Sequence, residues 1–144
     1  MHKDFYASGF IYHLPSQQIL LQQHQTSTAT AFPWLLFENV HTEDKEPATV
    51  FKDTLLHLLG ITVDAIYPIY SYLDEQTQKN YSLLYATVET LQEFPQKNGF
   101  TFRWFPFKDV LKLQAAEQIK HDIVVGQRVI EAARRKANGE HTFQ

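Results

Sequence analysis

The chain has 144 residues, no cysteine, 44% hydrophobic residues and a formal net charge of −3. This length predicts a single domain over residues 1–144 with one hydrophobic core, and the lack of cysteine excludes disulfides and thiolate metal sites. The longest apolar run, Ala31 to Phe37, is too short to cross a membrane, and no secretory signal is visible. We therefore expect a cytoplasmic protein with no membrane partner, and the slightly negative charge disfavours a nucleic-acid partner.

Hydrophobic periodicity predicts a mixture of strands and helices. Apolar residues alternate with polar ones where we expect strands, and they recur every three to four residues where we expect helices. In chain order, the predicted elements are the strands Phe5–His13, Ile19–Gln23 and Pro33–Phe37, a helix from Pro47 to Gly60, the strands Tyr67–Leu73, Tyr81–Val88 and Phe100–Phe105, a short helix Lys108–Leu113 and a long helix Ala115–Ala137. The fold class is α+β, with a mixed sheet and two long helices.

Some residues within these elements carry more specific expectations. The segment Glu38–Glu46 contains four carboxylates and no regular period, which predicts a loop. Pro68 predicts a sheet edge or a β-bulge, because proline cannot donate to a ladder. Strand alternation places Tyr70 on one face of its strand and Ile69 on the other.

The order of elements and three local matches resemble the Nudix hydrolase superfamily. Gly9–Tyr12 followed by Ile19–Gln23 is similar to the opening hairpin of that family, and Arg103–Leu111 is similar to its late strand and short helix. Between them, Asn39 to Ile61 aligns without a gap with the Nudix box. The resemblance covers nearly the full chain and implies a Nudix-like mixed β-sheet sandwiched between helices.

The resemblance also implies where catalysis would occur. The family pattern runs Gly, five residues, Glu, seven residues, then Arg-Glu-hydrophobic-any-Glu-Glu-any-Gly-hydrophobic. Carboxylates three and four positions apart lie on one face of a helix. There they hold Mg²⁺ or Mn²⁺, and the metal activates water to attack a pyrophosphate.

This sequence keeps the frame of the box and lacks most of its acidic side chains. Gly60 and Ile61 close the box as the pattern requires, and Glu46 lies one place beyond the first glutamate position. The positions of the first glutamate, the arginine and the three helix glutamates fall on Lys45, Asp53, Thr54, His57 and Leu58. A neutral side chain attracts a divalent ion much less strongly than a carboxylate does. We therefore expect a degenerate box with no catalytic residue at these positions and no cofactor.

Three functions remain open at this point. The first is a small-ligand or nucleotide-binding, regulatory module that is deficient in metal-dependent pyrophosphate hydrolysis and is not an enzyme. Its candidate ligand contacts are Trp34, Glu38, His57, Tyr70, Tyr72 and Tyr85. The second is an active hydrolase of nucleoside diphosphate derivatives, with a Mg²⁺ or Mn²⁺ site rebuilt from Glu43, Asp44 and Glu46. The third is an interaction scaffold that forms a homodimer through its many aromatic residues.

Overall fold

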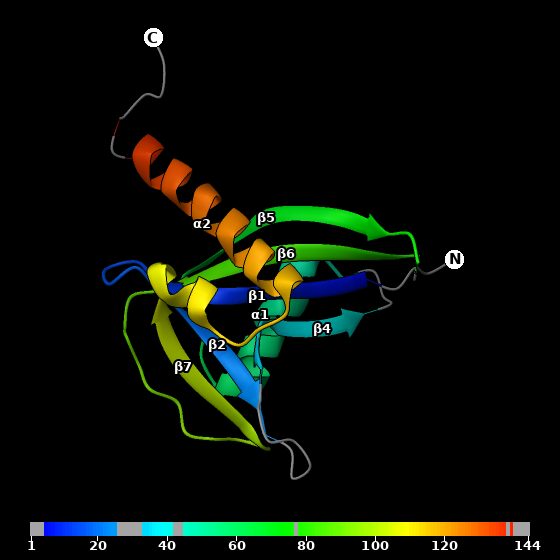
Figure 1. Cartoon of the computed structure of the whole chain (residues 1–144), viewed down its shortest axis with the longest axis horizontal. Coiled ribbons are helices and arrows are strands. Elements are labelled where there is room, and N and C mark those ends of the chain that lie inside the picture. The colour runs from blue at the N-terminus through cyan, green and yellow to red at the C-terminus, as the bar shows by residue number, and fades with distance from the viewer. Residues whose placement is uncertain (1–4, 26–32, 42–44, 77, 138, 140–144) are drawn as a thin grey trace.

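A mixed sheet of seven strands lies between two long helices, with α2 in front of the sheet and α1 behind it in Figure 1. The structure is a computed structural model that describes residues 5–25, 33–41, 45–76, 78–137 and 139, with the backbone alone for residues 40 and 41. The elements are β1 (Phe5–His13), β2 (Gln18–His24), β3 (Trp34–Leu35), β4 (Phe37–His41), α1 (Pro47–Leu59), β5 (Ala65–Asp74), β6 (Lys79–Val88), β7 (Phe100–Pro106), the 3-10 helix η1 (Phe107–Lys112) and α2 (Glu117–Ala137). The predicted α+β class with a mixed sheet is confirmed.

Strand β1 organises the sheet because three strands pair with it. Its full length pairs in parallel with β6 on one edge. The other edge is shared: residues 5–9 pair antiparallel with β4, and residues 11–13 pair antiparallel with β2. Beyond this point β2 continues between β7 and the short β3. Beyond residues 11–13 the strands β1 and β2 separate, and β4 and β3 pair with the edges that they leave free. The site described below lies beside these strands.

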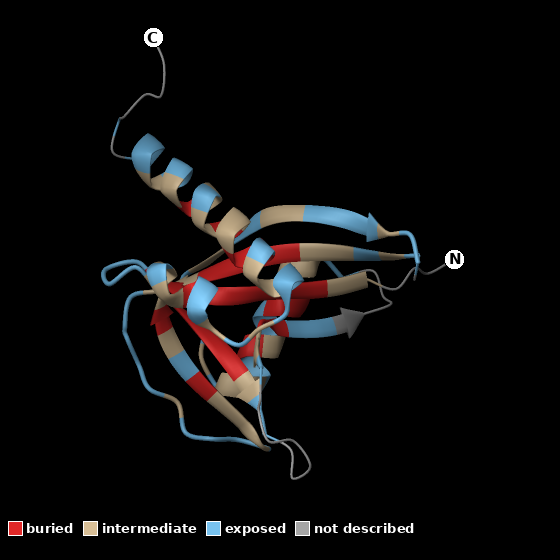
Figure 2. Cartoon of the chain, viewed as in Figure 1, coloured by how far each residue is buried: buried red, intermediate tan, exposed pale blue. Residues whose placement is uncertain are grey.

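The two sides of the sheet bury separate apolar clusters, as the alternation along β1 requires. Phe10 and Tyr12 point toward α2, whereas Ala7 and Ile11 point toward α1. On the α2 side the cluster includes Ile123. Figure 2 shows that the buried residues concentrate in the middle of the sheet and on the helix faces turned toward it. Among the described helices, none is long and apolar enough to cross a membrane.

The predicted helix boundary at Gly60 is confirmed. Gly60 follows α1 with a φ of 71°, and its N–H donates to the carbonyl of Leu56. This left-handed conformation is accessible to glycine at little cost, which explains why the helix ends there.

Three expectations from the sequence are wrong in detail. The loop predicted over Glu38–Glu46 begins as strand β4, because backbone pairing with β1 forms a strand where the side chains show no period. The short helix after β7 is a 3-10 helix, and α2 begins at Glu117 rather than Ala115. The candidates Glu43 and Asp44 lie outside the described residues.

Strand β5 contains the irregularity that Pro68 predicts. Its register against β6 shifts between Pro68 and Tyr70, which marks a β-bulge. Ile69 and Tyr70 consequently both pack against the cluster beneath α2, so their predicted placement on opposite faces is wrong. The bulge lets the Tyr70 side chain reach α2.

Candidate ligand-binding site

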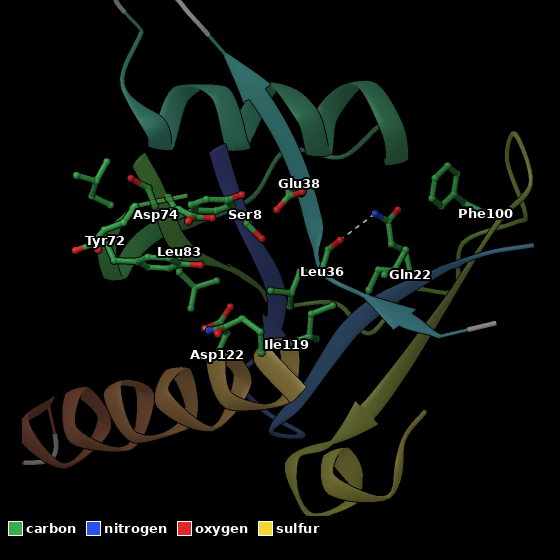
Figure 3. Close-up of a pocket in the computed structure, with 16 residues that line it drawn as sticks. Ser8, Gln22, Leu36, Glu38, Tyr72, Asp74, Leu83, Phe100, Ile119 and Asp122 are labelled. Atoms are coloured by element: carbon green, nitrogen blue, oxygen red, sulfur yellow. Dashed lines mark hydrogen bonds between the residues drawn. The ribbon is translucent and has the colours of Figure 1, made fainter. Parts of the chain in front are cut away.

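A cleft of about 750 Å³ opens beside the N-terminal turns of α2. Its walls come from β1, β2, β3, β4, the outer ends of β5 and β6, the start of β7 and the first turns of α2 (Figure 3). In Figure 3, Glu38 from β4 and Asp122 from α2 lie on opposite sides of the cleft, and Tyr72 closes a third side. Apolar side chains complete the lining: Leu36 between β3 and β4, Leu83 from β6, Phe100 from β7 and Ile119 from α2.

Four tyrosines form a continuous stack along one wall. Tyr6, Tyr81 and Tyr72 are directly paired across β1, β6 and β5, so their rings lie side by side on the same sheet face. The ring centroids are 4.4 Å apart for Tyr6 and Tyr81 and 5.1 Å apart for Tyr81 and Tyr72, with planes within 10°. Tyr70 extends the stack, 5.6 Å from Tyr72. Cross-strand aromatic pairs of this kind stabilise the sheet and give the cleft a rigid wall.

The stack is joined to α2 through a buried carboxylate. Asp122 is only 7% exposed. The Tyr70 hydroxyl donates to Asp122 Oδ1 at 2.5 Å, and the Gln118 amide donates to the same oxygen at 2.9 Å. Burial raises the pKa of the Tyr70 hydroxyl, and the hydrogen bond to Asp122 raises it further. Tyr70 therefore remains a neutral donor that orients the carboxylate at the edge of the cleft.

The electrostatic character of the cleft is acidic. Glu38, Asp74, Glu75 and Asp122 line it, and no lysine or arginine does so among the described residues. Glu38 is exposed by surface area, yet the surrounding protein displaces enough water to raise the pKa of its carboxyl group, and the negative charge of Asp122 adds to this shift. The same two effects, burial first and then the charge of Asp122, raise the pKa of Tyr72. The cleft therefore carries negative charge without a lining cation to neutralise it.

Gln22, which lines the cleft with part of its side chain, has an unused hydrogen-bond acceptor that is closed off from solvent. Its side chain is buried, at 8% exposure, and its Nε2 donates to the Leu36 carbonyl at 3.0 Å. Its Oε1 has no hydrogen-bond partner among the described residues. A buried acceptor of this kind is costly when nothing donates to it.

A second cavity of about 590 Å³ follows the box helix α1 and shares Gln22, Glu38 and Phe100 with the cleft. The helix positions that resemble the metal-binding glutamates carry no carboxylate. Thr54 Oγ1 donates to the Val50 carbonyl at 2.8 Å and accepts from Asn39 at 3.2 Å, so this oxygen is already engaged. The other two glutamate positions of the helix carry an imidazole and an alkyl chain.

Two of the remaining box positions form an ion pair at the surface. The ammonium of Lys45 lies 3.6 Å from the Asp53 carboxylate. Within the described ranges, no group of three histidines or carboxylates lies close enough together to hold a metal ion. Glu46 precedes α1 and its side chain makes no capping hydrogen bond.

The candidate ligand contacts from the sequence are placed in different parts of the molecule. Glu38 and Tyr72 line the cleft, and Tyr70 supports it through Asp122. His57 lies on the exposed surface of α1 and lines the second cavity instead.

Two candidate contacts lie away from both cavities. Trp34 packs its ring edge-to-face against Phe105, with centroids 4.8 Å apart. Tyr85 is 5% exposed and fills the core beneath α2 between Phe10 and Tyr12. Both side chains thus serve the packing of the sheet.

Sequence reasoning missed Asp122, Gln118, Gln22 and Tyr81. A signal for Asp122 was present, because it lies between Ile119 and Ile123 on the apolar face of its helix. A carboxylate at such a position is buried only when other groups donate to it. The other three residues carry no local signal, since their role depends on strands and helices that are distant in the sequence.

Comparison with known proteins connects this architecture to solved structures. No protein-family model matches the chain, and no curated protein matches it in sequence. The fold is similar to that of MutT as described for Aliivibrio salmonicida and Vibrio cholerae, with a TM-score of 0.67, 15% identity, and coverage of 90% of this chain and 98% of that one. It is also similar to the E. coli ORF135 protein, with a TM-score of 0.66, 16% identity, and coverage of 92% and 94%.

A third similar structure identifies the fold by name. The Nudix domain of Shewanella oneidensis NrtR, complexed with ADP ribose, matches with a TM-score of 0.64, 16% identity, and coverage of 88% of this chain and 86% of that one. The chain therefore has the Nudix fold, and the fold predicted from the sequence resemblance is confirmed. A shared fold does not carry an activity with it, so function must be argued from the site.

Proposed function

We propose that this protein is a small-ligand-binding module on a Nudix fold and that it does not hydrolyse pyrophosphates by the metal-dependent route of that family. One observation carries the proposal: carboxylates and apolar side chains from several elements line the cleft beside α2, whereas the box positions of α1 present Thr54, His57 and Leu58. Loss of even one metal-activating group can cost several kcal/mol of transition-state stabilisation, or about a thousandfold in rate.

The cleft has the properties of a ligand site. It is concave, its volume lies in the usual range for small-molecule pockets, and apolar walls surround a few polar groups. A ligand would pack its apolar body against the wall that includes Tyr72 and Leu83. The Glu38 and Asp122 carboxylates would accept hydrogen bonds from it and set its orientation.

The NrtR Nudix domain, complexed with ADP ribose, makes a nucleotide derivative one candidate ligand class. The fold comparison supports testing this class first but does not decide it. ADP ribose is a direct probe because it is both a nucleoside diphosphate derivative and a potential hydrolase substrate.

The proposal is tested by measuring binding and turnover together. ADP ribose and ADP are incubated with the protein and either Mg²⁺ or Mn²⁺, product is followed by chromatography, and binding is followed by calorimetry. We expect no metal-dependent product. Metal-dependent turnover that is lost in Glu43→Ala or Asp44→Ala would overturn the proposal in favour of a hydrolase with a rebuilt site. A homodimer stays a prediction, which sedimentation equilibrium tests separately.

A further inference from the structure

A pocket of about 270 Å³ lies further along α2 than the cleft, between the β1–β2 turn, the start of η1 and the C-terminal half of α2. The pocket and the cleft share no lining residue. We propose that this pocket binds a small oxyanion, which is a carboxylate or phosphate group attached to an apolar body. The proposal goes beyond the ligand-binding function of the cleft and does not depend on it.

The charge of the lining favours an anion. Two cationic side chains from different elements line the pocket, Lys108 from η1 and Arg134 from α2. Neither of them has an ion-pair or hydrogen-bond partner among the described residues. Glu131 is the one carboxylate in the described lining, so the lining keeps a net positive charge. A guanidinium group without a protein partner suits the paired oxygens of a carboxylate or a phosphate.

The hydroxyl group of Tyr12 provides a second, independent observation. Tyr12 is 3% exposed and lines the pocket. Its hydroxyl has no hydrogen-bond partner among the described residues, and it is not closed off from solvent as Gln22 Oε1 is. A largely buried hydroxyl without a protein partner is stabilised by a ligand that accepts its hydrogen.

The charges that act on the Tyr12 hydroxyl are those of the pocket. Burial raises its pKa, the positive charge of Arg134 lowers it, and the negative charge of Glu131 raises it by less than Arg134 lowers it. The hydroxyl therefore lies near both charged groups, and it is a neutral donor at pH 7. A negatively charged acceptor beside this hydroxyl and Arg134 would satisfy both groups.

The turn that forms one wall of the pocket is fixed by its own hydrogen bonds. His13 is 6% exposed, and its Nε2 donates to the Glu89 carbonyl at 3.0 Å. Its Nδ1 accepts from the Ser16 N–H at 3.2 Å and lies 2.6 Å from Ser16 Oγ. Ser16 lines the pocket, so this wall does not need to become ordered when a ligand binds.

Four probes of similar size test the proposal: benzoate and phenyl phosphate, which are anionic, benzamide, which is neutral, and benzamidine, which is cationic. Their rings suit the apolar part of the lining, which is Pro106, Phe107 and Ile130. Each probe is titrated into the full-length ¹⁵N-labelled protein at pH 7, and amide shifts report affinity and location. We expect at least one anion to bind at least about tenfold more tightly than benzamide and benzamidine, with shifts at residues 14–17, 107–108 and 127–134. The tighter anion identifies the head group.

Variants of single side chains distinguish a built site from general attraction to a basic helix. Tyr12→Phe keeps the buried ring and should weaken anion binding by about three- to tenfold, with an unchanged urea midpoint because the hydroxyl has no protein partner to lose. Arg134→Gln should weaken it by about tenfold or more, whereas Glu131→Gln should strengthen it by about two- to threefold. Arg128→Gln removes an exposed charge of α2 outside the pocket, so it is the matched control and should bind as the wild type does.

Several outcomes would overturn the proposal. Benzamide that binds as tightly as both anions would do so, as would unchanged anion affinity in folded Tyr12→Phe. Equal weakening by Arg128→Gln and Arg134→Gln would show general charge attraction and overturn it as well. If Tyr12→Phe fails to fold, Glu131→Gln still decides, because unchanged or weaker anion binding in that variant contradicts the proposal. Anion shifts confined to the cleft amides would overturn this proposal and leave the ligand-binding function of the cleft standing.

Discussion

The two helices that cover the sheet differ in what they present to their surroundings. Helix α1 buries an apolar stripe of Val50, Phe51 and Leu55. The box positions Thr54, His57 and Leu58 lie beside this stripe and carry no carboxylate, and Leu58 packs against the same apolar cluster. Helix α2 does the reverse at its first turns, where it buries the carboxylate of Asp122 against Tyr70 and the cleft. The buried acid beside the proposed ligand site thus lies on α2, which is not the helix that the Nudix resemblance points to.

This contrast shows that the residues that pack a helix against the sheet need not be the residues that would bind a metal or ligand. The stripe that holds α1 to the sheet does not require acidic residues beside it, so the fold is kept with other residues at those positions. The fold depends more closely on the surroundings of Asp122, because a buried carboxylate without hydrogen-bond donors would strongly destabilise the protein. The α2 side therefore couples the stability of the fold to the proposed ligand site, and the α1 side does not.

The largest predicted effects come from alanine substitutions at two closely packed glycines, one on the α1 side of the sheet and one on the α2 side. In Gly9→Ala the new Cβ would lie 1.9 Å from the Leu84 carbonyl oxygen and 3.0 Å from the Phe51 ring on the α1 side. We expect a loss of about 3 kcal/mol or more in unfolding free energy, measured by urea denaturation, because a strand backbone cannot move aside. Gly126→Ala beneath α2 meets the Phe10 ring at 2.8 Å and should cost less, about 1–3 kcal/mol, because a side chain can shift. Equal losses would contradict this ranking.

The next effect tests the contrast between the acids of the two helices directly. Asp122→Ala removes the acceptor of the Tyr70 and Gln118 hydrogen bonds, and we expect it to lower the unfolding free energy by about 1.5–3 kcal/mol. Asp53→Ala on α1 loses only an exposed pair with Lys45 and should cost less than about 1 kcal/mol. A loss of unfolding free energy in Asp53→Ala as large as that in Asp122→Ala would contradict the difference between the two helices.

A third prediction restores the missing acidic face of α1. In the triple variant Thr54→Glu, His57→Glu, Leu58→Glu, carboxylates return to the box positions of the helix, and Mn²⁺ at ten times its Kd should stabilise the folded variant by about 1.4 kcal/mol. The wild type should show no specific stabilisation by Mn²⁺ in the same thermal melting experiment. A clear Mn²⁺-dependent rise in the Tm of the wild type would indicate a metal site and contradict the proposed function.

The smallest predicted effect concerns Glu38 and its pH dependence. Burial and the charge of Asp122 raise the pKa of Glu38, so the folded state holds this proton more tightly than the unfolded state does. Stability is therefore lost as the pH rises from the ordinary glutamate pKa through the raised value. Glu38→Gln should recover less than about 1 kcal/mol at pH 7, because solvent screens this exposed carboxyl group.

The measurement for Glu38→Gln has an internal control. At pH values below the ordinary glutamate pKa, where Glu38 is protonated in both states, the urea midpoints of variant and wild type should converge. The groups that face Glu38 across the cleft are Asp122 on α2, Tyr72 on β5 and Tyr81 on β6. A variant that is less stable than the wild type at pH 7 would show that the Glu38 charge is favourable where it lies.

The sequence by itself determined the elements whose signals are local. The opening hairpin, the α1 boundaries at Pro47 and Gly60, the β5–β6 pair and the long last helix all follow from periodicity and from the conformational limits of proline and glycine. The residue types at the box positions were also readable from fixed spacing, and the loss of metal binding inferred from them stays a prediction.

Only the tertiary structure decided where the site lies and which residues build it. Strand β4 exists because β1 pairs with it, and the bulge in β5 turns Tyr70 toward Asp122, 52 positions away in the chain. The tyrosine stack likewise depends on the register of three strands. Such contacts have no local period, since they are set by long-range pairing and burial, and those two effects appear only when the chain has folded.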